Sequence, residues 1–152
     1  MTVRRYLADG SVVDLTGAEL SAWEADQATR KIAQLPKRRE SRRLLHQQQA
    51  DARIALACGL PADARKEDVL TAQMRLMGGG LRAARAEGKG PNAQAKAQLD
   101  ALDALFTGIE AVRAAETAAN DAVAAAGLDD QMTPDQRLAE IDAVLDVDAR
   151  LA

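Results

Sequence analysis

Residues 99–123, LDALDALFTGIEAVRAAETAANDAV, decide the fold class because they form a long Ala-rich helical pattern with one narrow apolar stripe. From Leu99 to Val123 the apolar residues recur every three or four positions, which places them on one face of a helix. Alanine fills most other positions, so another backbone can approach closely, as in a helical hairpin or a bundle seam. We expect the centre of this stripe to bind a partner or another helix through Leu102, Phe106, Ile109 and Val112.

The flanking segments predict a mostly α chain that begins with a β-hairpin. Two β-prone runs, Thr2–Leu7 and Ser11–Leu15, surround Ala8-Asp9-Gly10, and an Asp-Gly turn between such runs is a strong hairpin signal. We divide the chain into a hairpin at 1–16, a basic helical region with a Gly-rich interruption at 17–90, a long Ala-rich helix at 91–127 and an acidic C-terminal helix at 128–152.

Capping and helix-breaking residues predict where the first three helices begin and end. Thr16-Gly17-Ala18-Glu19 has the pattern of a capping box, and Pro36 is expected to end or bend the first helix near Gln34. The pattern Gly78-Gly79-Gly80 predicts a hinge or a loop, since glycine is a poor helix former. The helical patterns expected between these signals cover residues 17–34, 37–57 and 64–77.

Similar signals delimit the last two helices. The long helix is expected to start near Pro91 or Asn92, after the break at 88–91, and to end at Gly127. Thr133-Pro134-Asp135-Gln136 predicts a second capping box that opens the last helix. This helix is expected to bury Leu138, Ile141 and Leu145.

The predicted core is thin for a chain of 152 residues. Tyr6, Trp23 and Phe106 are the only aromatic residues, and much of the apolar fraction is alanine. Small cores supply little net stability and are often completed by copies of the same chain or by a partner. We therefore expect a hairpin followed by a helical hairpin or small bundle that oligomerises or binds a partner, with Tyr6 and Trp23 as anchors.

Charge is distributed unevenly along the chain. Between Arg30 and Arg53 eight basic residues stand against two acidic ones, whereas residues 99–152 contain twelve acidic residues and three basic ones. The two regions should attract each other, either within one chain or between two copies. The residues expected to make the electrostatic contact are Arg38, Arg39, Arg42 and Arg43.

The sequence contains no pattern typical of a catalytic, cofactor or metal site, so we expect a protein that is not an enzyme. His46 has no nucleophile or carboxylate at a spacing that would make a proton relay, and is expected at the surface or partly buried. Cys58 is expected to be a buried, inert thiol. Lys89 is followed by Gly90, so the glycines at 88–90 do not match a phosphate-binding loop.

Hydropathy predicts no interaction with a membrane. No apolar run reaches the length of a membrane span, and the first residues, MTVRRYLADGS, lack the apolar stretch of a signal peptide. We expect a soluble protein made in a cytoplasm.

The basic run at 30–53 leaves a second function class open. Dense arginine on a helix neutralises phosphates, which is typical of a regulator that binds nucleic acid. No aromatic residue for base stacking lies in this run, and the chain has a net charge of −3, so nucleic acid is the less favoured partner.

The order of these elements resembles the small tail-accessory and tail-fibre-assembly proteins of tailed bacteriophages. The most specific part is LFTGIEAVRAAETA at 105–118, where Phe106, Ile109 and Arg113, followed by small residues, match a helix of that family. RRLLHQQQADAR at 42–53 is similar to the basic, Gln-containing helix that precedes it. The chain departs from the family in having Phe106 where tryptophan is frequent, in its three consecutive glycines, and in the helix that follows Pro134.

This resemblance implies a protein without enzymatic activity that binds other tail or fibre proteins. It implies either a permanent part of the baseplate or fibre attachment region, located in the virion, or an assembly chaperone that is absent from the mature particle. In both cases the protein would be assembled with its partners in the host cytoplasm.

Overall fold

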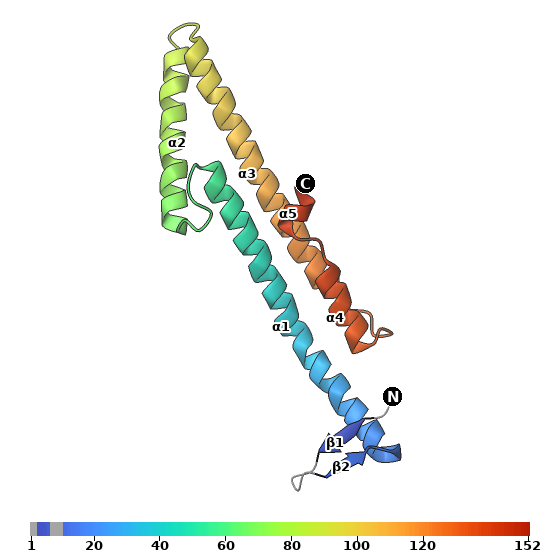
Figure 1. The fold of residues 1–152 in the computed structure, drawn as a ribbon. Coiled ribbons are helices and arrows are strands. Elements are labelled where there is room, and N and C mark those ends of the chain that lie inside the picture. The colour runs from blue at the N-terminus through green and yellow to red at the C-terminus, as the bar shows by residue number, and fades with distance from the viewer. Residues whose placement is uncertain (1–2, 7–10) are drawn as a thin grey trace.

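The computed structural model describes residues 3–6 and 11–152 and shows an elongated, mostly helical molecule with a small sheet at one end (Figure 1). This confirms the predicted fold class. The elements are β1 (Arg4–Tyr6), β2 (Val12–Asp14), α1 (Gly17–Ala57), α2 (Lys66–Glu87), α3 (Ala93–Ala125), α4 (Pro134–Ala143) and α5 (Val147–Arg150).

The long helix α3 organises the molecule because every other helix packs against it or against its neighbour α1. α1 packs along the C-terminal half of α3, and α2 packs along the N-terminal half (Figure 1). The chain then turns back, so that α4 lies on α1 and α5 contacts both α1 and α3. α3 therefore joins two helical hairpins that lie end to end.

Two small clusters form the centre of the seam between α1 and the C-terminal half of the chain. In the first, Ala50 of α1 meets Ala115 and Ala119 of α3, and Val147 of α5 closes the cluster. In the second, Leu35 of α1 packs against Ala126 and Ile141. Alanine at these contacts lets the α1 and α3 backbones approach closely, as the alanine pattern of residues 99–123 predicts.

The N-terminal hairpin forms with shorter strands than predicted. β1 pairs antiparallel with β2 in the register Arg4 with Asp14 and Tyr6 with Val12, and each strand has three residues. The predicted turn at 8–10 lies outside the described residues. All six strand residues are exposed, so the sheet has no apolar layer on either face within the described part of the chain.

Pro36 does not end the first helix, so the prediction that the helix stops near Gln34 is wrong. α1 continues through Pro36 to Ala57 as one helix. A proline inside a helix costs about 3 kcal/mol because it removes a hydrogen bond and crowds the preceding turn. Here contacts with the C-terminal helices hold the chain helical on both sides of the proline: Leu35 is buried, and Lys31 and Arg38 form ion pairs with α4.

The three consecutive glycines are not a hinge or a loop, which corrects a second prediction. Gly78, Gly79 and Gly80 lie inside α2, which continues to Glu87 and does not end near residue 77. Gly79 and Gly80 are buried, and a Cβ on Gly80 would lie 3.0 Å from Cδ2 of Leu102 on α3. The glycines therefore allow α2 and α3 to approach closely, which offsets their low helix propensity.

One of the two predicted capping boxes forms, and Asn92, near which the long helix is predicted to start, also acts as a cap. Asn92 caps α3 by accepting a hydrogen bond from the Ala95 backbone N–H, and Thr133 and Gln136 form the predicted capping box of α4. The Thr16–Glu19 box is wrong: the Thr16 side chain makes no capping bond, and the Glu19 N–H donates to the Thr16 carbonyl. Gly17 has a φ of +53°, outside the helical range, so the first turn does not present its N–H groups to Thr16.

The C-terminal segment forms two short helices and not the single helix expected. α4 ends at Ala143, and α5 starts four residues later with its own cap, Asp146. Ile141 is fully buried and Leu138 is half-buried, as predicted, but Leu145 lies in the connection and is exposed. The break lets Val147 reach the alanine cluster between α1 and α3.

The close approach at Gly80 predicts a position-specific loss of stability. Gly80→Leu should lower the free energy of unfolding by about 1–3 kcal/mol, because the new side chain overpacks against Leu102. Gly78→Leu is the matched control: a Cβ there meets only Arg82 Nη1 at 3.9 Å, and leucine is a better helix former than glycine. Urea unfolding followed by circular dichroism measures both. Equal stability of the two variants would show that the glycines do not set the α2–α3 distance.

Candidate interaction surfaces

The basic run of α1 faces the acidic C-terminal segment of the same chain. The attraction expected between the two charged regions thus operates within one molecule, and three ion pairs follow the seam from one end to the other. They join Lys31 to Asp135 at 2.6 Å, Arg38 to Asp142 at 2.5 Å and Arg53 to Asp148 at 2.5 Å.

Arg39 and Arg42 cap the ends of the helices that pack on α1. Arg39 donates to the carbonyl of Ala126, the C-cap residue of α3, at 2.7 Å. Arg42 donates to the carbonyl of Val144, the C-cap residue of α4. Neither α3 nor α4 has a basic residue in its own last turn, so α1 supplies the positive charge that stabilises these carbonyl ends.

Only one of the four arginines predicted as an electrostatic contact remains available to a partner. Arg38, Arg39 and Arg42 are used inside the chain, whereas Arg43 is exposed and forms no hydrogen bond or ion pair with the described residues. The number of arginines free to contact phosphate is therefore much smaller than the sequence indicates.

Two carboxylates of the seam are held in their charged form. Hydrogen bonds from the Arg38 guanidinium lower the pKa of Asp142 below its ordinary value. The pKa of Asp146 is lowered first by the Ala149 backbone N–H and then by the side-chain amide of Gln49. Asp146 thus caps α5 while Gln49 binds both Asp146 and the Val147 N–H, which fixes α5 on α1.

The predicted apolar stripe of α3 is largely occupied by the chain's own helices. Leu102, Phe106, Ile109 and Val112 are all half-buried. Leu102 lies against Gly80 of α2, and Val112 packs on the alanine cluster. The stripe therefore holds α3 to its neighbours, and less of it is available to a partner than the sequence indicates.

The predicted anchors Tyr6 and Trp23 both lie in an N-terminal arm, which we define as residues 3–6 and 11–30. The arm extends beyond α4 and beyond the end of α3 (Figure 1). Tyr6 is 78% exposed and Trp23 is 40% exposed. Trp23 borders a cleft of about 470 Å³ between the hairpin and the first turns of α1, which is also lined by Arg4, Arg5, Leu15, Glu19 and Ala22.

A second exposed apolar surface lies at the opposite end of the molecule and was not predicted. We call it the α2 stripe: Leu70, Met74, Met77 and Leu81. The sequence does carry a signal for two apolar faces on this helix: Leu76, Gly80 and Ala83 follow one helical spacing, and the four stripe residues follow another.

Two polar positions are buried differently from the predictions. His46 of α1 is fully buried because α1 and α3 are in contact where it lies. Its Nδ1 is 3.1 Å from Oδ1 of Asn120 on α3. Nε2 of His46 is buried without a hydrogen-bond partner in the described part of the chain. Cys58 is half-exposed and not buried, since it lies at the C-cap of α1, where the helix leaves α3.

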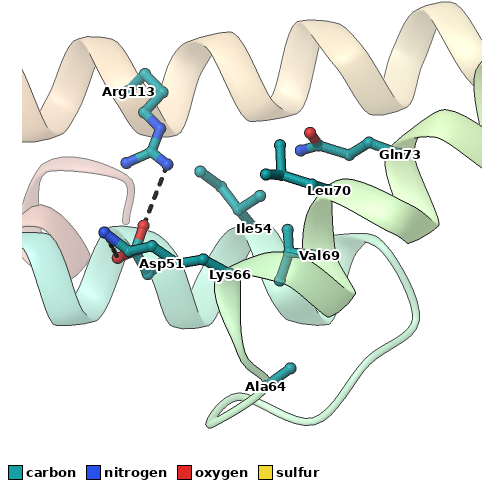
Figure 2. Close-up of a pocket in the computed structure, with 8 residues that line it drawn as sticks. All are labelled: Asp51, Ile54, Ala64, Lys66, Val69, Leu70, Gln73 and Arg113. Atoms are coloured by element: carbon teal, nitrogen blue, oxygen red, sulfur yellow. Dashed lines mark hydrogen bonds and ion pairs between the residues drawn. The ribbon is translucent and has the colours of Figure 1, made fainter.

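A small cavity lies where the end of α1, the start of α2 and the middle of α3 meet (Figure 2). Asp51 forms ion pairs there with Arg113 at 3.1 Å and with Lys66 at 3.6 Å, so its charge is balanced from two other helices. The volume of about 170 Å³ is below the range of ordinary ligand pockets. The arrangement ties three helices together and leaves no unpaired charge for a ligand.

Searches of known protein families, curated proteins and solved structures find no significant match to this chain. Within residues 3–6 and 11–152 no helix is both long and apolar enough to cross a membrane. The same residues contain no group of three or more His, Cys, Asp or Glu side chains that could hold a metal ion. The evidence on function therefore comes from the exposed surfaces.

Neighbouring arginines on α1 should differ in their contribution to stability. Arg42→Ala should lower the free energy of unfolding by about 1.5–3 kcal/mol, because it removes a part-buried charged hydrogen bond to the end of α4. Arg43→Ala is the matched control and should change it by less than about 0.5 kcal/mol. Chemical denaturation measures both variants. A similar loss in the two would mean that general charge, and not helix capping, stabilises the seam.

The lowered pKa values of Asp142 and Asp146 predict a loss of stability in acid. Each carboxylate stabilises the fold fully above its unfolded-state pKa of about 3.9, and this contribution disappears as the pH falls through the lower folded-state value. The melting temperature should decrease below about pH 4, and less steeply in Asp142→Asn/Asp146→Asn. Asp103→Asn, at an exposed carboxylate without a hydrogen bond or ion pair among the described residues, should keep the steep decrease.

Proposed function

We propose that this chain is a non-enzymatic structural or assembly protein of a bacteriophage tail, which binds another tail or fibre component through its N-terminal arm. The observation that carries the proposal is the arm itself. Between Gly17 and Arg30, α1 has no fully buried residue, although the hairpin borders its first turns. A helix and hairpin that bury so little of themselves are suited to completion by another protein.

The arm offers two complementary modes of contact. The β1–β2 sheet has two strands, so each strand has an edge to which a partner strand can add by main-chain hydrogen bonds. The adjoining cleft combines the Trp23 ring with the positive charges of Arg4 and Arg5. Tryptophan and arginine are the residue types most enriched at energetically dominant interface positions. We infer a partner segment that is extended, with an apolar side chain for the cleft and an acidic group for the arginines.

The assignment to a phage tail rests on the sequence resemblance at 42–53 and 105–118. Both segments lie on the α1–α3 seam, where Ala50, Ala115 and Ala119 require small residues and Arg42 caps a helix end. A protein of this family would use the seam as its scaffold and the exposed arm for binding.

The test is co-expression with the structural proteins encoded by the genes next to its own, followed by size-exclusion chromatography with light scattering. We expect a complex of defined mass with a tail or fibre protein. Trp23→Ala should weaken that complex about 30-fold or more, the loss typical of a tryptophan that dominates an interface. Ile32→Ala, at a comparably exposed apolar position beyond the arm, is the control and should leave the affinity unchanged.

Three outcomes separate the alternatives. No complex with any tail or fibre protein contradicts the proposed function. A complex that Trp23→Ala leaves intact contradicts the assignment of the arm as its binding surface. A complex that forms in cells, with the chain then absent from purified particles, identifies an assembly chaperone and not a permanent tail component.

A further inference from the structure

The α2 stripe has the geometry of a helix-pairing seam without a partner. Leu70, Met74, Met77 and Leu81 are 59%, 72%, 55% and 64% exposed. Their spacings of four, three and four residues are those of the core positions of a two-stranded coiled coil, which place the side chains in one continuous line. Such a line of exposed apolar side chains is unusual on a monomeric surface and indicates an interaction site.

The stripe lies on a face of α2 that its own chain leaves largely uncovered, although Leu70 at one end also borders the cavity where α1, α2 and α3 meet (Figure 2). α2 contacts α3 through Gly79, Gly80 and Ala83, which are the buried residues of the helix. At 100° per residue the centre of the stripe lies about 145° around the helix from this buried face. A second helix could therefore pack on the stripe without displacing α3.

The charges beside the stripe define what can cover it. Glu67 and Arg85 are eighteen residues apart, about five complete turns, so they lie on the same flank of the stripe near its two ends. Both are exposed, and neither forms an ion pair within the described residues. The flank thus has one negative and one positive end at nearly equal distances from the midpoint between Met74 and Met77.

We propose that a second copy of this chain covers the α2 stripe, with the two α2 helices antiparallel and related by a two-fold axis near that midpoint. This arrangement brings Met74 opposite Met77 of the second copy and Leu70 opposite Leu81 of the second copy. It also brings Glu67 opposite Arg85 of the second copy, twice by symmetry. In a parallel pair the two-fold axis would instead place this flank of the two copies on opposite sides of the seam, so Glu67 and Arg85 of the two copies would not meet.

The second copy is favoured over an unrelated partner because the stripe is complementary to itself. Rotating α2 by 180° about the midpoint between Met74 and Met77 brings apolar residues onto apolar residues and the acidic end of the flank onto the basic end. A two-fold interface requires this kind of self-complementarity. This surface is separate from the arm, so self-association and binding of a tail protein succeed or fail independently.

Light scattering over a concentration series tests the self-association of the full chain. We expect the wild type to reach twice the 16.2 kDa of the chain, and Met74→Lys/Met77→Lys to remain at that mass. Both substituted positions are exposed, and circular dichroism should show that the variant is folded. The matched control is Leu44→Lys on α1, where leucine is 49% exposed and outside the stripe, and it should associate like the wild type. A monomeric wild type or a dimeric double variant would overturn the proposal.

Cross-linking tests the antiparallel orientation. In a Cys58→Ser background, Leu70→Cys and Leu81→Cys should form a disulfide efficiently only when the two variants are mixed, because each position faces the other in the second copy. In a parallel pair, each variant would cross-link with itself, since the two positions lie about 16 Å apart along the helix. Self-cross-linking of the separate variants would therefore contradict the proposed orientation.

Charge reversal supplies an independent readout of the same pairing. Glu67→Arg and Arg85→Glu should each weaken self-association, and the double variant should restore it, because only opposite charges then meet at both ends. Single changes that leave the dissociation constant of the dimer unaltered would show that Glu67 and Arg85 do not face each other.

Discussion

The close contact of α1 with α3 at Ala50, Ala115 and Ala119 is the constraint on which the rest of the structure depends. Alanine buries little apolar area. Dispersion between the closely packed atoms of the two helices therefore stabilises this contact more than the transfer of large side chains out of water does. Proximity brings the α1 side chains within reach of the ends of α3 and α4. The arginine caps, the His46–Asn120 contact and the attachment of α5 by Gln49 all require it.

The charge asymmetry of the sequence has a structural explanation in this arrangement. A thin apolar core leaves the C-terminal segment with few side chains to bury, and Ile141 and Val147 are its fully buried ones. Polar contacts with α1 provide the remaining attachment: ion pairs at exposed positions, and charged hydrogen bonds to helix ends where the seam is part-buried. Exposed ion pairs contribute little individually, so the helix-capping arginines carry more of this attachment.

Local signals predicted the fold class and several helix ends, and failed where tertiary contacts override local preference. Asn92 and Thr133 acted as caps because the cap and its helix are within four residues of each other. Pro36 and Gly80 were misread because the contacts that hold them helical come from residues more than twenty positions away. The same limit applies to the interaction surfaces: Arg38, Arg39 and Arg42 look available in the sequence, and only the fold shows that the C-terminal segment uses them. The α2 stripe was missed because a sequence does not show which of two apolar faces is covered.

The positions of the arm and the α2 stripe at opposite ends of the rod give self-association a geometrical consequence. The arm and α2 are separated by the length of the α1–α3 seam (Figure 1). An antiparallel two-fold pairing of α2 reverses the direction of the second rod, so the two arms point away from each other at the far ends of the dimer. Each arm then remains as accessible as in the monomer. A parallel pairing would bring both arms to the same side and orient them toward a single partner surface. The orientation of α2 therefore decides whether the dimer links two separate sites of an assembly or binds one site with two arms.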